Sequence, residues 1–257
     1  MIHGDDEDDD SIDINLRSRV EIGHRLIILN AVLARVGLES NAPLGGDPAD
    51  IADAEAERFD LLTWLKDVGA IVALSRTEGT LLRTAVPKLL FELVTESSWQ
   101  AERLAIIAWG AGLVDQLKPM HEEADVSAAL GLIPTPWDGV ADFIAGLQPR
   151  SDEEVAGELE RSEIWLWRAE TEEARRIADR GELVEIAQAI ADVVAEGVEM
   201  GLFERAPDGD FLANGKSFHR LSEEQRTKIA IIASERLRAL NWLRGAGDDW
   251  DDLSTDL

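Results

Sequence analysis

The sequence contains one pair of residues with the spacing of a helical metal motif. Glu21 and His24 are separated by two residues, which places both side chains on one face of a helix. Di-iron helical bundles combine two such motifs with two further glutamates. The other histidines, at positions 3, 121 and 219, have no glutamate three residues before them. We therefore interpret Glu21 and His24 as an ordinary surface pair, and expect no metal and no other cofactor.

The chain does not contain a complete set of residues for nucleophilic catalysis. Cysteine is absent, no Gly-x-Ser-x-Gly elbow occurs, and the four histidines are scattered. The Gly-Ala-Gly stretches at residues 110–112 and 245–247 follow helical patterns and not strands, so they indicate helix ends and not phosphate loops. The acid pairs at 248–249 and 251–252 are typical of a solvated tail, although such pairs also bind hard cations. The catalytic residues remain unknown, and the sequence favours a protein that is not an enzyme.

The charge of the chain limits its partners. The formal net charge is −27 at pH 7, with twenty arginines and five lysines. This balance argues against nucleic acid, whose phosphates are bound by basic side chains, and favours a basic protein as partner. Residues 5–10 are all acidic, unlike the start of a signal peptide, and the longest uncharged apolar stretch, 104–114, is shorter than the ~20 residues that span a bilayer. We expect a cytoplasmic protein with no membrane contact; its oligomeric state is unknown.

The chain divides into three parts. Residues 1–14 are predicted to be a disordered acidic arm, because like charges repel and little apolar surface is available to offset ordering. Residues 15–247 are expected to form a single α-helical domain. Residues 248–257 form an acidic C-terminal tail, from which Trp250 is expected to fold back onto the body.

Capping signals and apolar periodicity predict an all-α fold, a compact bundle of roughly seven to nine antiparallel helices. The main helices are predicted at residues 17–36, 48–68, 151–179 and 183–200, with Gly37 and Gly181 as helix stops. Ser97 is expected to cap the helix that follows it, and Pro136 to open a short helix ending near residue 145. The one exception to the helical pattern is a minimal β-hairpin near residues 211–218, where Asn214-Gly215 favours a type I′ turn.

The stretch from residue 221 to the C-terminus is predicted to contain the central helix. Ser222 and Gln225 form a capping box, and Gly245 follows the last helical residue, so the helix has about 23 residues. Its apolar stripe is interrupted by Arg236, whose guanidinium either reaches solvent past its neighbours or anchors a buried ion pair. We favour the ion pair. Glu102, a carboxylate in mostly apolar company on another predicted helix, is the first candidate partner.

Three blocks of this sequence contain tryptophan beside charged residues. They lie at residues 98–112, which begin Ser98-Trp99-Gln100, at residues 161–168, and at residues 235–256, which contain Glu235-Arg236-Leu237-Arg238 and Asp249-Trp250-Asp251. These blocks resemble a bacterial family known as domain of unknown function 4272. The resemblance spans most of the chain and implies a fold neighbourhood, but no activity.

The residues that match this family also supply the candidate site. Several tryptophans that line one cleft with buried polar groups would form a pocket for a small ligand. The members of this candidate pocket or buried polar network are Trp99, Glu102, Trp109, Glu235, Arg236, Asn241, Trp242 and Asp251.

Two functions follow from the sequence. The first is a non-catalytic interaction or regulatory module with an acidic surface; the alternative is a small-molecule-binding protein or enzyme with a pocket near Glu102, Arg236, Asn241 and Trp242. The same residues are also open to a purely architectural role.

Overall fold

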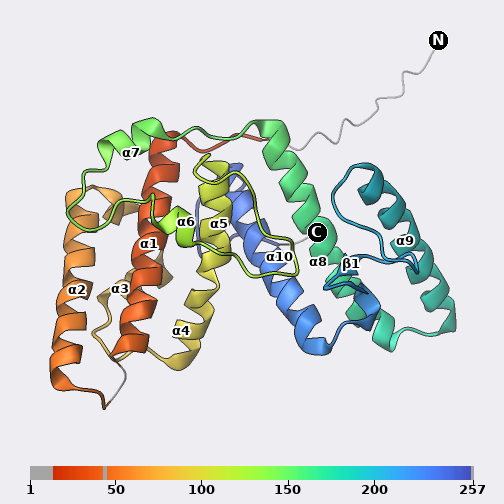
Figure 1. Ribbon diagram of the computed structural model, residues 1–257, viewed down its shortest axis with the longest axis horizontal. Helices are drawn as coiled ribbons and strands as arrows, with labels where there is room; N and C mark the ends of the chain where they lie inside the picture. Colours follow the sequence, from red (N-terminus) through yellow and green to blue (C-terminus); the bar gives the residue numbers. More distant parts are fainter. Residues whose placement is uncertain (1–13, 43–44, 256–257) are drawn as a thin grey trace, which may run out of the picture.

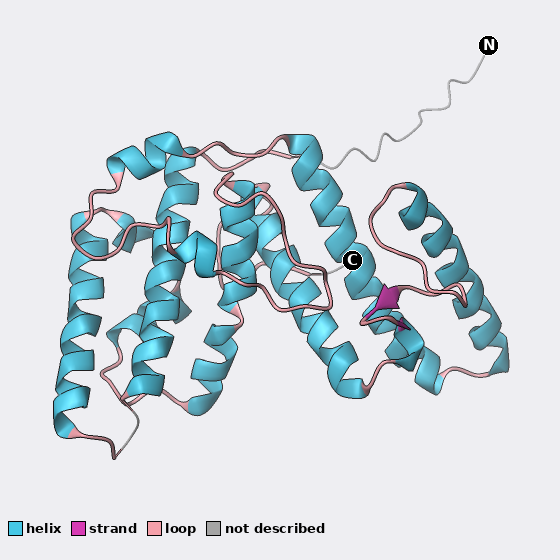
Figure 2. Ribbon diagram, viewed as in Figure 1, coloured by secondary structure: helices cyan, strands magenta, loops and turns pink. Residues whose placement is uncertain are grey.

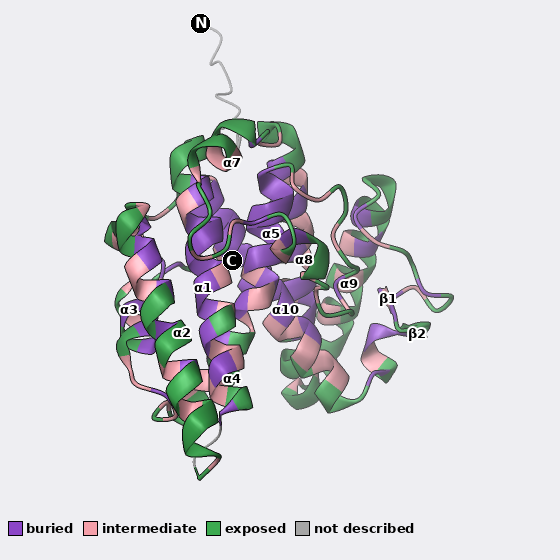
Figure 3. Cartoon of the chain, turned by 60° about the vertical axis from the view of Figure 1, so that its left-hand side comes forward, coloured by how far each residue is buried: buried purple, intermediate pink, exposed green. Residues whose placement is uncertain are grey.

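Helix α10 (Glu223–Leu243) lies at the centre of the molecule, where it packs between α5 (Gln100–Gly110) and α8 (Asp152–Ile177) (Figure 1). The computed structural model describes residues 14–42 and 45–255. Ile232 and Leu240, one turn before and one turn after Arg236 on the predicted apolar stripe, are buried, and so is Trp242 on another side of the helix. The helix is central because it is apolar on more than one side, and Figure 3 shows its buried surface continuing into α5.

The other long helices continue the packing in a row on both sides of α10. On one side, α5 contacts α1 (Arg19–Asn41), which in turn contacts α2 (Pro48–Asp67). On the other side, α8 contacts α9 (Arg180–Glu199), which lies at the outer edge (Figure 1). Shorter elements complete the fold: η1 (Ala70–Ala73), α3 (Arg76–Arg83), α4 (Phe91–Ser98), α6 (Ser127–Leu130), α7 (Ala141–Gly146) and η2 (Phe218–Arg220).

Apart from one small sheet, the regular structure within residues 14–42 and 45–255 is helical (Figure 2). Eight of these helices have at least eight residues, so the predicted helical bundle is confirmed. The predicted hairpin is also confirmed, with β1 (Leu212–Ala213) antiparallel to β2 (Lys216–Ser217). Its turn residues Asn214 and Gly215 have φ angles of 51° and 68°, which a type I′ turn requires.

Several helix starts were predicted correctly from their capping residues. Ser75, Ser151 and Ser222 each form a capping box with the Glu or Gln three residues later, a spacing from which the sequence predicts these helix starts, and Asp47 caps α2 with Pro48 at its first position. Each box satisfies two backbone N–H groups that have no partner within the helix. Gly245, at φ 81°, follows α10 as predicted.

Two predicted glycine stops were wrong. Helix α1 continues through Gly37 to Asn41, because an interior glycine costs only about 1 kcal/mol and Leu38 beyond it is buried. Near Gly181, α8 ends earlier, at Ile177. Asp179 then caps α9 through the N–H groups of Gly181 and Glu182, so this glycine lies in the first turn of the next helix.

Two predicted helix starts were also wrong. Ser97 is buried inside α4, and Trp99 joins α4 to α5 with helical dihedral angles, so the chain needs no side-chain cap there. After Pro136, the carboxylate of Asp138 accepts hydrogen bonds from the N–H and hydroxyl of Thr135 and closes a turn. Trp137 has a φ of 78°, which is not helical, and α7 begins only at Ala141. The predicted acidic arm lies almost wholly outside the described residues.

A buried ion pair attaches the hairpin region to α8. Arg168 of α8 donates two hydrogen bonds of 2.8 Å to the two carboxylate oxygens of Asp210, which precedes β1. Asp210 also accepts from the backbone N–H and Nδ1 of His219. Burial alone would raise the pKa of Asp210, but the hydrogen bonds and charge of Arg168, together with His219, lower it to about 2. The folded state therefore favours the ionised carboxylate.

We predict that Asp210→Asn flattens the acid limb of the stability profile. Because the pKa of Asp210 is lower in the folded state, its stabilisation is fully present above about pH 4 and is lost as the pH falls through about 2. Urea unfolding between those values should show a smaller loss of stability for the variant than for the wild type. The exposed Asp60→Asn serves as the control. An equal acid-induced loss in the variant and the wild type would contradict the prediction.

Candidate ligand-binding pocket

The interruption in the apolar stripe of α10 is a buried ion pair. Arg236 Nε donates a 3.0 Å hydrogen bond to Glu102 Oε2 on α5. The side chains of Arg236 and Glu102 are only 1% and 2% exposed. The interpretation of Arg236 as the anchor of a buried pair with Glu102 is thus confirmed, and the pair fixes how α5 and α10 lie against each other.

The segment that follows α5 forms two further hydrogen bonds with this pair. Arg236 Nη1 donates to the carbonyl of Lys118 over 2.8 Å, and Glu102 Oε1 accepts from the backbone N–H of Ala124 over 2.6 Å. Both charged groups therefore hold the segment of residues 111–126 against the two helices. Removing either charge would release part of that segment as well as the helix contact.

One guanidinium nitrogen of Arg236 has no hydrogen-bond acceptor among the described residues. This nitrogen, Nη2, is buried. An unpaired buried donor is uncommon, because it costs about 1 to 3 kcal/mol relative to a satisfied one. Four other buried side-chain donors of the described residues share this state, on Arg25, Arg35, Arg226 and Trp250, but Arg236 differs from them in lining the pocket described next.

Arg236 lies in the wall of a pocket of about 650 Å³, which we call the Arg236 pocket. Trp109 of α5 and Trp165 of α8 contribute aromatic walls. Arg161 and Glu158, one and two turns before Trp165 on α8, contribute charged groups. The remaining wall comes from residues 115–121, 202–204 and the hairpin residues 212, 214 and 215. The pocket thus forms where α5, α8 and α10 meet two loops and the hairpin.

Glu158 and Arg161 form a second ion pair at this pocket. Arg161 Nη1 donates to Glu158 Oε2, and Arg161 Nε donates to the carbonyl of Leu202 over 2.9 Å. Glu158 is only 4% exposed. Its burial raises the pKa of the carboxyl above the usual value, although the charges of Arg161 and Arg236 oppose that rise. The carboxylate is therefore incompletely compensated by its surroundings.

The charges around the pocket are balanced, in contrast to the chain as a whole. The acidic residues of the wall are Asp115, Glu158 and Glu204, and the basic ones are Lys118, Arg161 and Arg236. With histidine neutral, these three negative and three positive charges cancel, whereas the whole chain carries −27. The pocket is therefore a locally neutral site in a strongly acidic protein.

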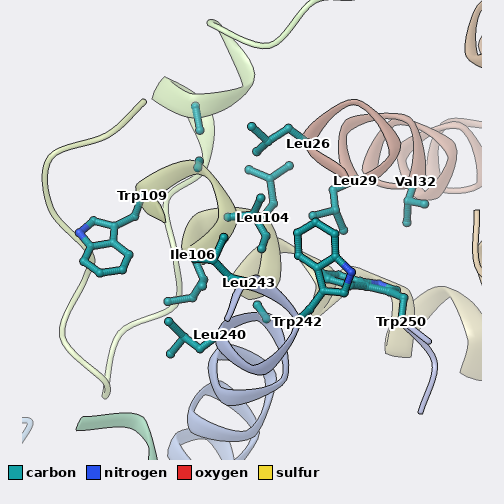
Figure 4. Packing of buried hydrophobic residues seen from close by; sticks show 14 of the residues in the cluster. Leu26, Leu29, Val32, Leu104, Ile106, Trp109, Leu240, Trp242, Leu243 and Trp250 are labelled. Carbon is teal, nitrogen blue, oxygen red and sulfur yellow. The ribbon is translucent and has the colours of Figure 1, made fainter. Parts of the chain in front are cut away.

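Other members of the predicted site hold the C-terminal segment instead. Asn241 Nδ2 donates to the carbonyl of Ser254 over 3.0 Å. The indole of Trp242 meets that of Trp250 edge to face, with the ring centroids 5.6 Å apart. Figure 4 shows Trp109 on one side of the packed core and Trp242 and Trp250 on the other. Trp250 is 2% exposed, so its predicted return to the body is confirmed.

Glu235 and Asp251 belong to the same C-terminal contact. Glu235 forms an ion pair with Arg103, whose guanidinium carbon lies 5.3 Å from the ring centroid of Trp250. Asp251 Oδ2 accepts from the N–H of Thr77 in the first turn of α3, over 2.9 Å. These residues therefore secure the segment after α10 to α3 and α5.

The structure thus separates the predicted site into two groups. Arg236, Glu102 and Trp109 lie at or directly behind the Arg236 pocket, whereas Asn241 and Trp242 face the C-terminal segment. This division follows from helical geometry, because at about 100° per residue a position five or six residues after Arg236 projects from another side of α10. Trp99 is half-buried between α4 and α5 and does not line the pocket.

The site predicted from the sequence did not include Glu158, Arg161 or Trp165, although Arg161 and Trp165 lie in the block at 161–168 that resembles the family. The signal that was available is the spacing of the three residues, at positions i, i+3 and i+7, which places them on one face of a helix. Glu21, the acid of the suspected metal motif, accepts from the backbone N–H of Ser18 and so serves as a helix cap. No group of three or more His, Cys, Asp or Glu side chains arranged to hold a metal occurs in the described part of the chain.

We predict a strong energetic coupling between Glu102 and Arg236. Arg236→Met alone should lower the free energy of unfolding by about 3 to 5 kcal/mol, because Glu102 remains buried without its partner. The double variant with Glu102→Leu should lose clearly less than the sum of the two single losses. Urea unfolding of the four proteins measures the coupling. The same cycle at the exposed pair Glu173 and Arg176 should give about 0 to 1 kcal/mol. Additive losses at Glu102 and Arg236 would contradict the prediction.

Comparison with known proteins gives a family but no activity. A family model described as "Domain of unknown function (DUF4272)" matches residues 8–195. The matched range includes the blocks at 98–112 and 161–168, whereas the block at 235–256 lies beyond it. Searches of curated proteins and of solved structures found no match. None of the helices within the described ranges combines the length and apolar character needed to cross a membrane. Because the family model covers well over half of its length, the chain belongs to the DUF4272 family.

Proposed function

We propose that this protein binds a small molecule in the Arg236 pocket. The observation that supports the proposal is the buried Nη2 of Arg236, which has no acceptor in the described chain and belongs to a residue of the pocket wall. A ligand oxygen bonded to that nitrogen would remove the cost of an unpaired buried donor. The free protein thus carries an unfavourable feature that ligand binding corrects.

The form of the pocket supports the same proposal. Its volume of about 650 Å³ lies within the range of typical ligand sites, roughly 300 to 1,000 Å³. Ligand sites combine apolar walls with a few well-placed polar groups. Trp109 and Trp165 provide the apolar walls, while Arg161, Glu158 and Arg236 provide the polar groups. The ion pairs of these charged residues hold them in place before a ligand arrives.

Filling the pocket is expected to weaken ligand binding at least tenfold. Gln116 is an exposed residue of the pocket wall, so Gln116→Trp places an indole in the opening without disturbing the core. A metabolite library is screened against the wild type by ligand-observed NMR, and hits are confirmed by shifts of the Trp109 and Trp165 indole N–H signals. Gln188→Trp, on the exposed surface of α9, is the matched control. We expect hits that bind the wild type and the control and lose at least tenfold affinity in Gln116→Trp.

Two results would overturn the small-molecule proposal. The first is a library without any compound that shifts the two indole signals. The second is a set of hits whose affinity is the same in Gln116→Trp and in the wild type, because binding would then occur elsewhere.

We also propose that the acidic surface binds a basic protein partner. The net charge of −27 supports this second proposal. Helix α2 offers one such surface, because Asp50, Asp53, Glu57 and Asp60 are all exposed and their spacing places them on one face. Attraction between exposed charges acts over about 10 Å at 0.1 M salt and about 3 Å at 1 M. A partner held by this surface should therefore dissociate at high salt.

The salt dependence of binding tests the second proposal. In a pull-down from lysate of the native host, we expect a stoichiometric basic protein at about 0.1 M salt that is lost at about 1 M. Neutralising the four α2 acids to their amides should reduce the capture at low salt. A partner retained equally at both salt concentrations would contradict the acidic-surface mechanism.

A further inference from the structure

We propose that the ligand of the Arg236 pocket is a small zwitterion of the α-amino acid type, with a carboxylate held by Arg236 and Arg161 and an amine held by Glu158. This inference rests on the small-molecule function proposed above and adds the chemical class of the ligand. It follows from the free hydrogen-bonding groups of three side chains, from the charge balance of the pocket and from its aromatic walls.

The carboxylate end is matched by two guanidinium groups. Arg236 uses Nε for Glu102 and Nη1 for the carbonyl of Lys118, which leaves Nη2. Arg161 uses Nη1 for Glu158 and Nε for the carbonyl of Leu202, which leaves its own Nη2 without a partner among the described residues. Both arginines line the same pocket as Glu158, and the positive charge of each opposes the rise in the pKa of that carboxyl. Guanidinium N–H groups form their strongest hydrogen bonds with carboxylates.

The amine end is matched by Glu158. One of its oxygens accepts from Arg161, and the other has no hydrogen-bond donor in the described chain. The burial of this carboxylate outweighs the two nearby arginines, so that its pKa is raised and the ionised form lacks compensation. An ammonium group beside the free oxygen would supply the missing positive charge. A purely anionic ligand would instead add negative charge next to Glu158.

The charge balance of the pocket also favours a ligand without net charge. The wall carries equal numbers of acidic and basic side chains, so a zwitterion leaves the balance unchanged. A multiply charged anion such as a phosphate ester would bring uncompensated charge into a protein of net charge −27. Trp109 and Trp165 of the wall can then contact an apolar side chain of the ligand.

The experiment uses the full chain and defined probes. The twenty standard amino acids are titrated by calorimetry and by the indole N–H signals of Trp109 and Trp165. The best binder is then compared with its N-acetyl derivative, which lacks the ammonium, and with its amide, which lacks the carboxylate. We expect at least one amino acid to bind, and each derivative to bind at least tenfold more weakly.

Two glutamate variants test whether Glu158 makes the contact to the ligand amine. Glu158→Gln should weaken binding of the amino acid at least tenfold, because the contact to the amine is lost. It should not weaken binding of the N-acetyl derivative, because that anion lacks the amine and is repelled by the charge of Glu158. Glu173→Gln is the matched control: it lies on the same helix in a Glu–Arg pair of the same i,i+3 spacing, but it is 63% exposed and outside the pocket. Its affinity for the amino acid should equal that of the wild type, and unfolding curves confirm that both variants fold.

The outcomes separate this inference from the function on which it rests. If library compounds bind in the pocket but no amino acid does, or if the N-acetyl or amide derivative binds as well as the parent, the zwitterion class is wrong and the small-molecule function stands. If neither the library nor the amino acids shift the two indole signals, both proposals fail, and an ordered water at Nη2 of Arg236 explains the site. An equal loss of affinity for the amino acid in Glu158→Gln and in Glu173→Gln would also overturn the inference.

Discussion

The guanidinium of Arg236 is buried among apolar helices, and a charge so far from water has to be matched by acceptors. Glu102 of α5 and the carbonyl of Lys118 provide two of them, which ties the central helix α10 both to α5 and to the segment that follows α5. That segment forms one side of the Arg236 pocket. The same pair therefore orients the two most central helices and shapes the site that we propose to bind a ligand.

Similar pairs recur at other contacts between elements. Arg25 of α1 donates to Glu78 at the start of α3, and its guanidinium carbon lies 4.2 Å from the ring centroid of Trp250. Arg168 of α8 holds Asp210 beside the hairpin. Such pairs contribute little net stability over apolar contacts of the same shape, but breaking one leaves a buried charge. The planar guanidinium can bond several acceptors at once, which suits a chain with twenty arginines and five lysines.

The Arg236 pocket lies where three helices meet the hairpin. Helix α10 packs between α5 and α8, and all three helices contribute to the wall. Trp165 of α8 links this wall to the hairpin region, because it lines the pocket and packs edge to face against Phe211, with the ring centroids 5.2 Å apart. A ligand in this position would contact the helices and the hairpin, so its binding would stabilise their relative arrangement.

The sequence by itself determined the features that depend on neighbouring residues. Serine capping boxes started α3, α8 and α10 where predicted, and Asn214-Gly215 formed the expected turn, because these signals act within a few residues. Local signals were misleading at Gly37, where the burial of Leu38 continued the helix, and at Pro136, where Asp138 closed a turn instead. The pairing of Glu102 with Arg236 was within reach of the sequence, since both interrupt apolar faces. Only the tertiary structure decided which residues surround the pocket. Three residues of α8 join Arg236 there, whereas Asn241 and Trp242 of α10 contact the C-terminal segment. This division depends on which faces of α8 and α10 meet and on where the loops cross these helices.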